Sequence, residues 1–208
     1  MRRVLALLLF SLLIATNGFS IDIDVDPGNY SGMWAIYGQT FYTGPTTISL
    51  EPGTHYVQPG QGTFTIEVGS DGMVTVPNGV SAIGGQNSLT FNSTTIAVQP
   101  GAYTGLWQVH RAMSNYLTGD GSVVLVPEVS YGMVVGQGGF YFKASATGQV
   151  SVNKGYSAVG GQGALTFNTT EVNIDPADYT GTWYLHRGNT PLLTGPATVV
   201  VVPGAEQI

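Results

Sequence analysis

The sequence predicts an all-β protein built from tandem β-sandwich modules of immunoglobulin-like or prealbumin-like type. Short runs rich in Val, Ile, Thr, Tyr and Phe recur about every 8 to 12 residues, separated by turns that contain Gly, Pro or Asn. No segment shows an apolar stripe at helical spacing, and the 30 Gly and 11 Pro would interrupt one. The third observation is an internal repeat of about 75 residues.

Self-comparison of the chain locates this repeat. Residues Gly79–Arg111 match Gly155–Arg187 without a gap, at an offset of 155 − 79 = 76 residues. The matching part contains a Tyr-x-Gly-x-Trp motif, and a third copy of the motif follows the leader. The copies align Tyr30 with Tyr103 and Tyr179, and Trp34 with Trp107 and Trp183.

Each repeat divides into two stretches. The Trp half contains a short strand, the Tyr-x-Gly-x-Trp motif and a Thr-Gly turn, and its three copies end at Gly53, Glu128 and Gly204. The Gly half contains two strands, a turn with the motif Ser-Ala-x-Gly-Gly-Gln, and a Leu-Thr-Phe-Asn strand. The order along the chain is Trp, Gly, Trp, Gly, Trp. Five half units forming a small five-bladed propeller, or another β-repeat, is the alternative architecture.

The N-terminus has the layout of a secretory signal peptide. Arg2 and Arg3 precede the apolar run Val4–Ile14, which is too short for a membrane span of about 20 residues. We expect cleavage after Ser20, or alternatively after Gly18, and a secreted or cell-surface protein without a membrane span in the mature chain. The expected organisation is a signal peptide at 1–20, repeat units at 21–95 and 96–170, and a C-terminal half unit at 171–208.

Composition excludes several classes of function. Lys and Arg number 6 against 12 Asp and Glu, without a basic cluster beyond the leader, so nucleic acid is not an expected partner. Cysteine is absent, which excludes disulfides, thiolate nucleophiles and Cys-ligated metals. With 9% charged residues, the surface must consist mainly of uncharged polar side chains.

Alternation along the Trp strand predicts which side chains form the core. Tyr103, Gly105, Trp107 and Val109 share one face, and their counterparts in the other copies are also aromatic, aliphatic or Gly. We expect this face to be buried in all three copies, with the constant Gly leaving room for an aromatic ring from a neighbouring strand. The opposite face should point outward.

The segment TGPTTISLEPGTHYV, residues Thr43–Val57, gives a resemblance to known modules. In its order of turn, strand, Leu-x-Pro-Gly and aromatic residue, it resembles the surface modules called PEGA and carboxypeptidase-regulatory-like domains. That resemblance implies a β-sandwich and no catalytic activity.

Outward side chains of the Trp strand are the candidate ligand-binding residues. Aromatic rings stack on sugars and polar groups hydrogen-bond them, so glycans are candidate partners of this face. Packing against other surface proteins or self-association uses the same face equally well. The candidates are Tyr37, Gln108, His110, Tyr184 and His186.

Three carboxylates alternate on the first strand after the leader. Asp22, Asp24 and Asp26 form a candidate calcium site, but the other repeats do not share it, and charge on a strand also prevents mispairing of an exposed edge. No cofactor is expected. Since no catalytic motif is found, we expect a structural, adhesive or matrix protein, with a carbohydrate-binding module as the alternative and an enzyme as a distant one.

Overall fold

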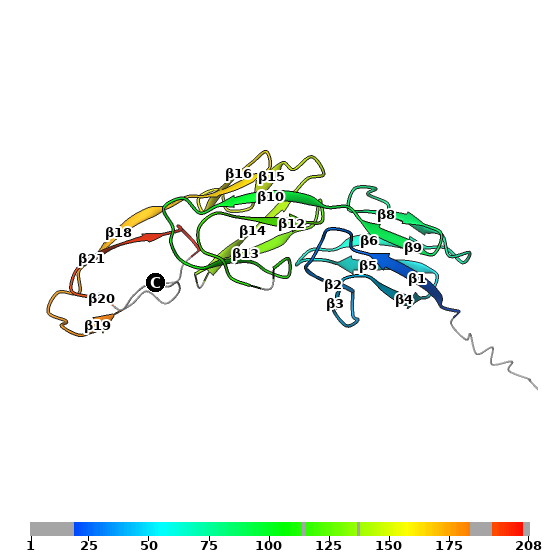
Figure 1. Ribbon diagram of the computed structural model, residues 1–208, viewed down its shortest axis with the longest axis horizontal. Helices are drawn as coiled ribbons and strands as arrows, with labels where there is room; N and C mark the ends of the chain where they lie inside the picture. The colour runs from blue at the N-terminus through cyan, green and yellow to red at the C-terminus, as the bar shows by residue number, and fades with distance from the viewer. Residues whose placement is uncertain (1–18, 114, 137, 184–192, 206–208) are drawn as a thin grey trace, which may run out of the picture.

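The computed structural model describes residues 19–113, 115–136, 138–183 and 193–205. Regular secondary structure in these ranges is all β-strand, as predicted, and none of it is helix (Figure 1). These ranges accordingly contain no helix that is long and apolar enough to cross a membrane. Buried and exposed residues alternate along strands such as Ile21–Asp26, so each of these strands turns one face to the core.

Two sheets form the first unit, and both halves of the repeat contribute to each of them. The strands are β1 (Ile21–Asp26), β2 (Met33–Ile36), β3 (Tyr42–Thr43), β4 (Thr46–Leu50), β5 (Gly53–Gln58), β6 (Phe64–Val68), β7 (Val74–Thr75), β8 (Ala82–Gly85) and β9 (Ser88–Phe91). One sheet has the order β4-β1-β9-β8, and the other has the order β3-β2-β5-β6-β7. Strand β1 pairs antiparallel with β4 and parallel with β9.

The second unit repeats this topology. Its strands are β10 (Thr94–Gln99), β11 (Trp107–Val109), β12 (Gly121–Leu125), β13 (Tyr131–Val135), β14 (Gly138–Ala144), β15 (Val150–Val152), β16 (Ala158–Gly161) and β17 (Ala164–Phe167). The sheet orders are β12-β10-β17-β16 and β11-β13-β14-β15. The parallel registers also correspond, because Val25 lies opposite Leu89 in the first unit and Val98 lies opposite Leu165 in the second.

Two short strand pairs follow the second unit. Strand β18 (Thr170–Ile174) pairs with β21 (Ala197–Val201), and β19 (Thr182–Trp183) pairs with β20 (Leu193–Thr194). They are the third copies of β1 with β4 and of β2 with β3. Figure 1 shows the first unit, the second unit and these pairs following one another along the long axis.

The sheets of the described residues form neither a closed barrel nor a propeller. A propeller would place each half unit in a blade of its own. Here the two halves of a unit share their sheets instead, since β1 from the Trp half pairs with β9 from the Gly half. The five-bladed alternative therefore finds no support in the strand pairing.

Aromatic side chains join the two sheets of each unit. In the first unit, the Phe91 ring on β9 lies 5.5 Å from Trp34 and 5.6 Å from Phe64, which belong to the other sheet. In the second, Phe167 on β17 lies 6.5 Å from Trp107 and 5.9 Å from Phe140. Edge-to-face contacts of this kind contribute beyond the burial of apolar area. The last residue of the Leu-Thr-Phe strand thus lies at the centre of each core.

The Tyr-x-Gly-x-Trp motif has the same local geometry in all three copies. Each Trp indole donates a hydrogen bond to a turn carbonyl, from Trp34 to Gly44 at 3.2 Å, from Trp107 to Gly119 at 2.9 Å and from Trp183 to Gly195 at 2.9 Å. The middle Gly is needed because a Cβ there would collide with the hydroxyl of the motif's own Tyr. The expectation of a ring from a neighbouring strand is therefore wrong. The ring comes from two residues earlier.

The predicted core face is buried in two copies and open in the third. Tyr30 and Tyr103 are 1% and 4% exposed, whereas Tyr179 is 57% exposed. Trp34 and Trp107 are fully buried and Trp183 is half-buried. The prediction is wrong for the third copy, because no Phe of a Leu-Thr-Phe strand covers it among the described residues.

The Gly-Gly pair of the Ser-Ala-x-Gly-Gly-Gln motif lies in a strand, where a turn was predicted. Gly84 belongs to β8, and a Cβ there would collide with the carbonyl of Val74 on the neighbouring strand. Gly160 on β16 meets Val150 in the same way. Glycine is therefore required here for close strand packing, and the turn follows two residues later.

Candidate functional site

Several hydrogen bonds and close contacts connect the first and second units, and this region is called the joint below. Arg111, which follows β11, is held there by the first unit. Its carbonyl oxygen accepts a hydrogen bond of 2.8 Å from the amide of Met33, and its Nη1 donates one of 3.0 Å to the carbonyl of Gly60. The guanidinium lies 4.5 Å from the centre of the Phe41 ring, which is cation–π distance.

Arg111 also has an unusual backbone conformation. Its φ is 67°, in the left-handed region that costs a side-chain-bearing residue of the order of 1 kcal/mol or more. Such a conformation persists where surrounding contacts fix it. Here it directs the carbonyl and the side chain of one residue into the same neighbouring unit.

Backbone atoms of the two units approach closely elsewhere in the joint. The amides of Gln61 and Gly62 both donate to the carbonyl of Ser130, at 3.1 and 2.9 Å. A Cβ at Gly62 would lie 2.8 Å from the Ser130 amide nitrogen, and one at Gly60 would lie 2.7 Å from the Tyr131 ring. The Gly-Gln-Gly segment is thus shaped to the surface of the next unit.

Two tyrosines meet at the centre of the joint. The hydroxyl of Tyr30 lies within hydrogen-bond distance of the carbonyl oxygens of Met33, Pro59 and Arg111. The Tyr131 hydroxyl accepts a 2.9 Å bond from the Val126 amide, and the two rings are 6.5 Å apart. Burial raises the pKa of both phenols well above the ordinary value, because a charged phenolate would lose its hydration.

One serine of each unit forms a hydrogen bond to the next part of the chain. The Ser81 hydroxyl donates a 2.8 Å hydrogen bond to the carbonyl of Pro127 in the second unit, and the Ser157 hydroxyl donates a 2.6 Å bond to the carbonyl of Pro203 after β21. Both serines are fully buried, and they are the only fully buried polar residues in the described part of the chain. A buried hydroxyl that donates to one distant carbonyl is a specific hydrogen bond between two units.

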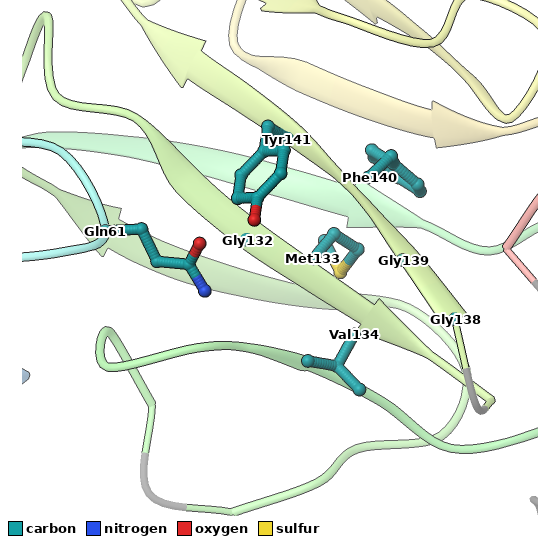
Figure 2. Close-up of a pocket in the computed structure, with 8 residues that line it drawn as sticks. All are labelled: Gln61, Gly132, Met133, Val134, Gly138, Gly139, Phe140 and Tyr141. Atoms are coloured by element: carbon teal, nitrogen blue, oxygen red, sulfur yellow. The ribbon is translucent and has the colours of Figure 1, made fainter.

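A shallow pocket opens beside the joint (Figure 2). The side chain of Gln61, from the first unit, extends over Gly132 of β13. A Cβ at Gly132 would lie 2.9 Å from the side-chain nitrogen of Gln61. Tyr141, the strand partner of Gly132 on β14, is half exposed, and its ring faces the same hollow. The cavity volume of about 210 Å³ is below the usual range of about 300 Å³ and more for small-molecule sites.

The predicted ligand-binding residues do not converge on this pocket. Tyr37 follows β2 in the first unit and is 70% exposed. Gln108 on β11 is half-buried, and its amide donates to the Met113 carbonyl at 3.1 Å. His110 is half-buried beside Arg111, and its backbone amide donates to Gly132. Tyr184 and His186 lie outside the described residues.

The three aspartates of β1 are engaged separately. The Ser49 hydroxyl donates to Asp22, the Thr47 hydroxyl donates to Asp24 at 2.6 Å, and the Gly28 amide donates to Asp26 at 2.8 Å. Their strand is internal in its sheet rather than the exposed edge that was considered. No group of three or more acidic or histidine side chains in the described ranges could hold a metal ion.

Sequence reasoning missed the residues that form the joint. The repeated His-Arg pair and the invariant Ser of the Ser-Ala-x-Gly-Gly-Gln motif were visible signals, but the partners of Arg111 and Ser81 lie 51 and 46 residues away. Tyr141 was missed as well, although its place between Phe140 and Phe142 on one strand was a signal for an outward side chain. Compared with known proteins, the chain matches no family model, no curated protein and no solved structure.

Proposed function

We propose that this chain is a structural β-repeat protein of the cell exterior, in which tandem β-sandwich modules form a stiff spacer or matrix element. The joint around Arg111 carries the proposal. Hydrogen bonds, close backbone contacts and a cation–π pair hold two units in one orientation, and such a joint transmits force and preserves spacing. The hydrogen bond from Ser157 to Pro203 connects the second unit to the strands that follow it in the same way.

Two features of the sequence support this role. The leader has the layout of an export signal, and a protein without disulfides outside the cell must rely on its core and its strand ladders. The paired sheets joined by Phe91 and Phe167 supply that core. We take each pair of sheets as one sandwich module.

The proposal is tested in the source cell and in solution. Immunogold labelling should find the protein outside the cell, with the N-terminus of the purified protein beginning near residue 21. Small-angle scattering should give one extended shape for the wild type and a broader distribution for a variant carrying Arg111→Ala and Ser81→Ala. Cytosolic labelling, or a wild type as flexible as the variant, would contradict the proposal.

Carbohydrate binding is the second candidate, and the surroundings of Tyr141 favour it. A half-exposed ring beside the amide of Gln61 offers stacking together with hydrogen bonding. Glycan-array binding should be lost in Tyr141→Ala and retained in Tyr116→Ala, a matched tyrosine that is 51% exposed elsewhere. Equal binding by both variants would exclude the pocket as the site.

A further inference from the structure

The first two Trp halves show what normally covers the outer edge of their first strand. In each, a Leu-Thr-Phe strand from the Gly half lies parallel to it, β9 beside β1 and β17 beside β10. The amide of Asp24 donates to the carbonyl of Asn87 at 2.9 Å, and the amide of Ala97 donates to Gly163 at 2.8 Å. The two copies therefore define one mode of strand addition.

In the described part of the third Trp half, the same edge is present and no such strand lies beside it. Among the described residues, β18 pairs with β21 alone. Asn173 lies opposite Thr198, as Asp24 lies opposite Thr47. Because the registers agree, the amide of Asn173 points to the open edge, where an added strand would offer it a carbonyl.

The apolar face beside this edge is also open. Val172 and Ile174 are half-buried, whereas their counterparts Ile23 and Val25 are 0% and 2% exposed. Tyr179 is 57% exposed, although Tyr103 lies 6.2 Å from the ring of Phe167 and is buried. Tyr179 and Trp183 thus correspond to the side chains that contact the Phe of the Leu-Thr-Phe strand in the complete units.

The acceptor is already formed. Trp183 donates to Gly195, and the Tyr179 hydroxyl donates to the carbonyl of Thr182 at 3.3 Å, as in the complete copies. The segment after β21 is held against the second unit, because the carbonyl of Pro203 accepts the hydrogen bond from Ser157 and Ala205 is fully buried. These described contacts are present before a strand is added, which favours affinity.

We propose that β18, with the open face of Val172, Ile174, Tyr179 and Trp183, is an acceptor for a free β-strand of small-Leu-Thr-Phe-Asn type. The strand binds parallel to β18, its Leu opposite Ile174 and its Phe on the rings of Tyr179 and Trp183. Main-chain hydrogen bonds supply affinity, and the Leu and Phe supply specificity. The inference rests on the proposed structural function and gives such a protein a specific point of connection.

A second copy of this chain is a poorer occupant. The motif Leu-Thr-Phe occurs twice in the sequence, and Leu89 and Leu165 are fully buried in their own units. A second copy could donate either strand only by opening a folded unit. A free segment of the same chemistry has no such cost.

The test uses a fluorescently labelled synthetic peptide with the sequence of residues 155–169, GYSAVGGQGALTFNT, and the purified full chain. Anisotropy should show saturable binding of one peptide per chain, with a change in Trp fluorescence as Trp183 is covered. A control peptide with Asp in place of its Leu and Phe should not bind. Ile174→Asp and Tyr179→Ala should weaken binding at least about tenfold, and Tyr116→Ala should not.

Absence of binding by a folded wild type, or equal binding by Tyr179→Ala, would overturn the acceptor. A stable dimer that excludes the peptide would also overturn it, in favour of a second copy as the occupant. Neither result bears on the rigid joint, because the scattering of the Arg111 and Ser81 variants is measured without peptide. The proposed function and the acceptor can therefore fail separately.

Discussion

The hydroxyl of Ser81 lies 2.8 Å from the carbonyl oxygen of Pro127, and 76 residues later Ser157 makes the same bond to Pro203. The spacing of 46 residues between donor and acceptor is identical in both. Because donor and acceptor belong to successive units, the bond serves the connection of units rather than the fold of any one unit.

Removal of this hydroxyl should weaken the chain. Ser81→Ala leaves the Pro127 carbonyl buried without its donor, so we expect the free energy of unfolding to fall by about 1 to 3 kcal/mol. Urea unfolding measures the change. Ser122→Ala, at an exposed serine of β12, is the control and should have little effect. An equal effect of both substitutions would show that the hydrogen bond from Ser81 to Pro127 makes no specific contribution to stability.

The tryptophans should differ between complete and incomplete copies. The repeat alone predicts the same loss for Trp107→Ala and Trp183→Ala. Because Trp107 is fully buried, its removal should cost about 3 to 5 kcal/mol, and the half-buried Trp183 should cost clearly less. Thermal unfolding of the two variants measures both losses. A larger loss for Trp183→Ala than for Trp107→Ala would contradict the prediction.

Stability should fall at alkaline pH through Tyr30 and Tyr131. Burial raises the pKa of both phenols in the folded state, so folding favours the neutral form. This contribution is complete below the unfolded pKa of about 10 and is lost as the pH rises above it. Denaturation at pH values from 8 to about 11 should show this loss, and Tyr30→Phe should make the curve flatter. A slope unchanged in Tyr30→Phe would contradict the assignment.

Two substitutions at Arg111 separate its backbone from its side chain. Arg111→Ala and Arg111→Gly both remove the bond to Gly60 and the contact with Phe41. Only glycine also relieves the positive φ, so Arg111→Gly should be more stable than Arg111→Ala by about 1 kcal/mol. Chemical denaturation measures this difference, and the reverse order would show that the strain is not present in solution.

The repeat and the alternation of apolar residues predicted much of the fold. The all-β class follows from local patterns, and so does the burial of Tyr30, Trp34, Tyr103 and Trp107, because each strand needs one apolar face. The Gly-Gly pair at Gly84 was misread, because a glycine in a turn and a glycine under a neighbouring strand look alike in sequence.

The candidate site depended more on the tertiary structure. Tyr37 is exposed as predicted, but no pattern in the chain connects Gln61 with Tyr141 or Arg111 with Gly60. These pairs arise from the packing of one unit on the next. The repeat marks one partner of such a contact, as at Ser81 and Ser157, but it does not show which distant residue that partner meets.

Sequence by itself determined the repeated motif and its alternation of faces, since these depend on residues a few positions apart. Only the tertiary structure decided whether a copy is covered. Tyr103 and Tyr179 occupy the same place in the same motif, yet one is 4% and the other 57% exposed. The physical reason is the neighbouring strand: Phe167 packs on Tyr103, and no described residue does the same for Tyr179.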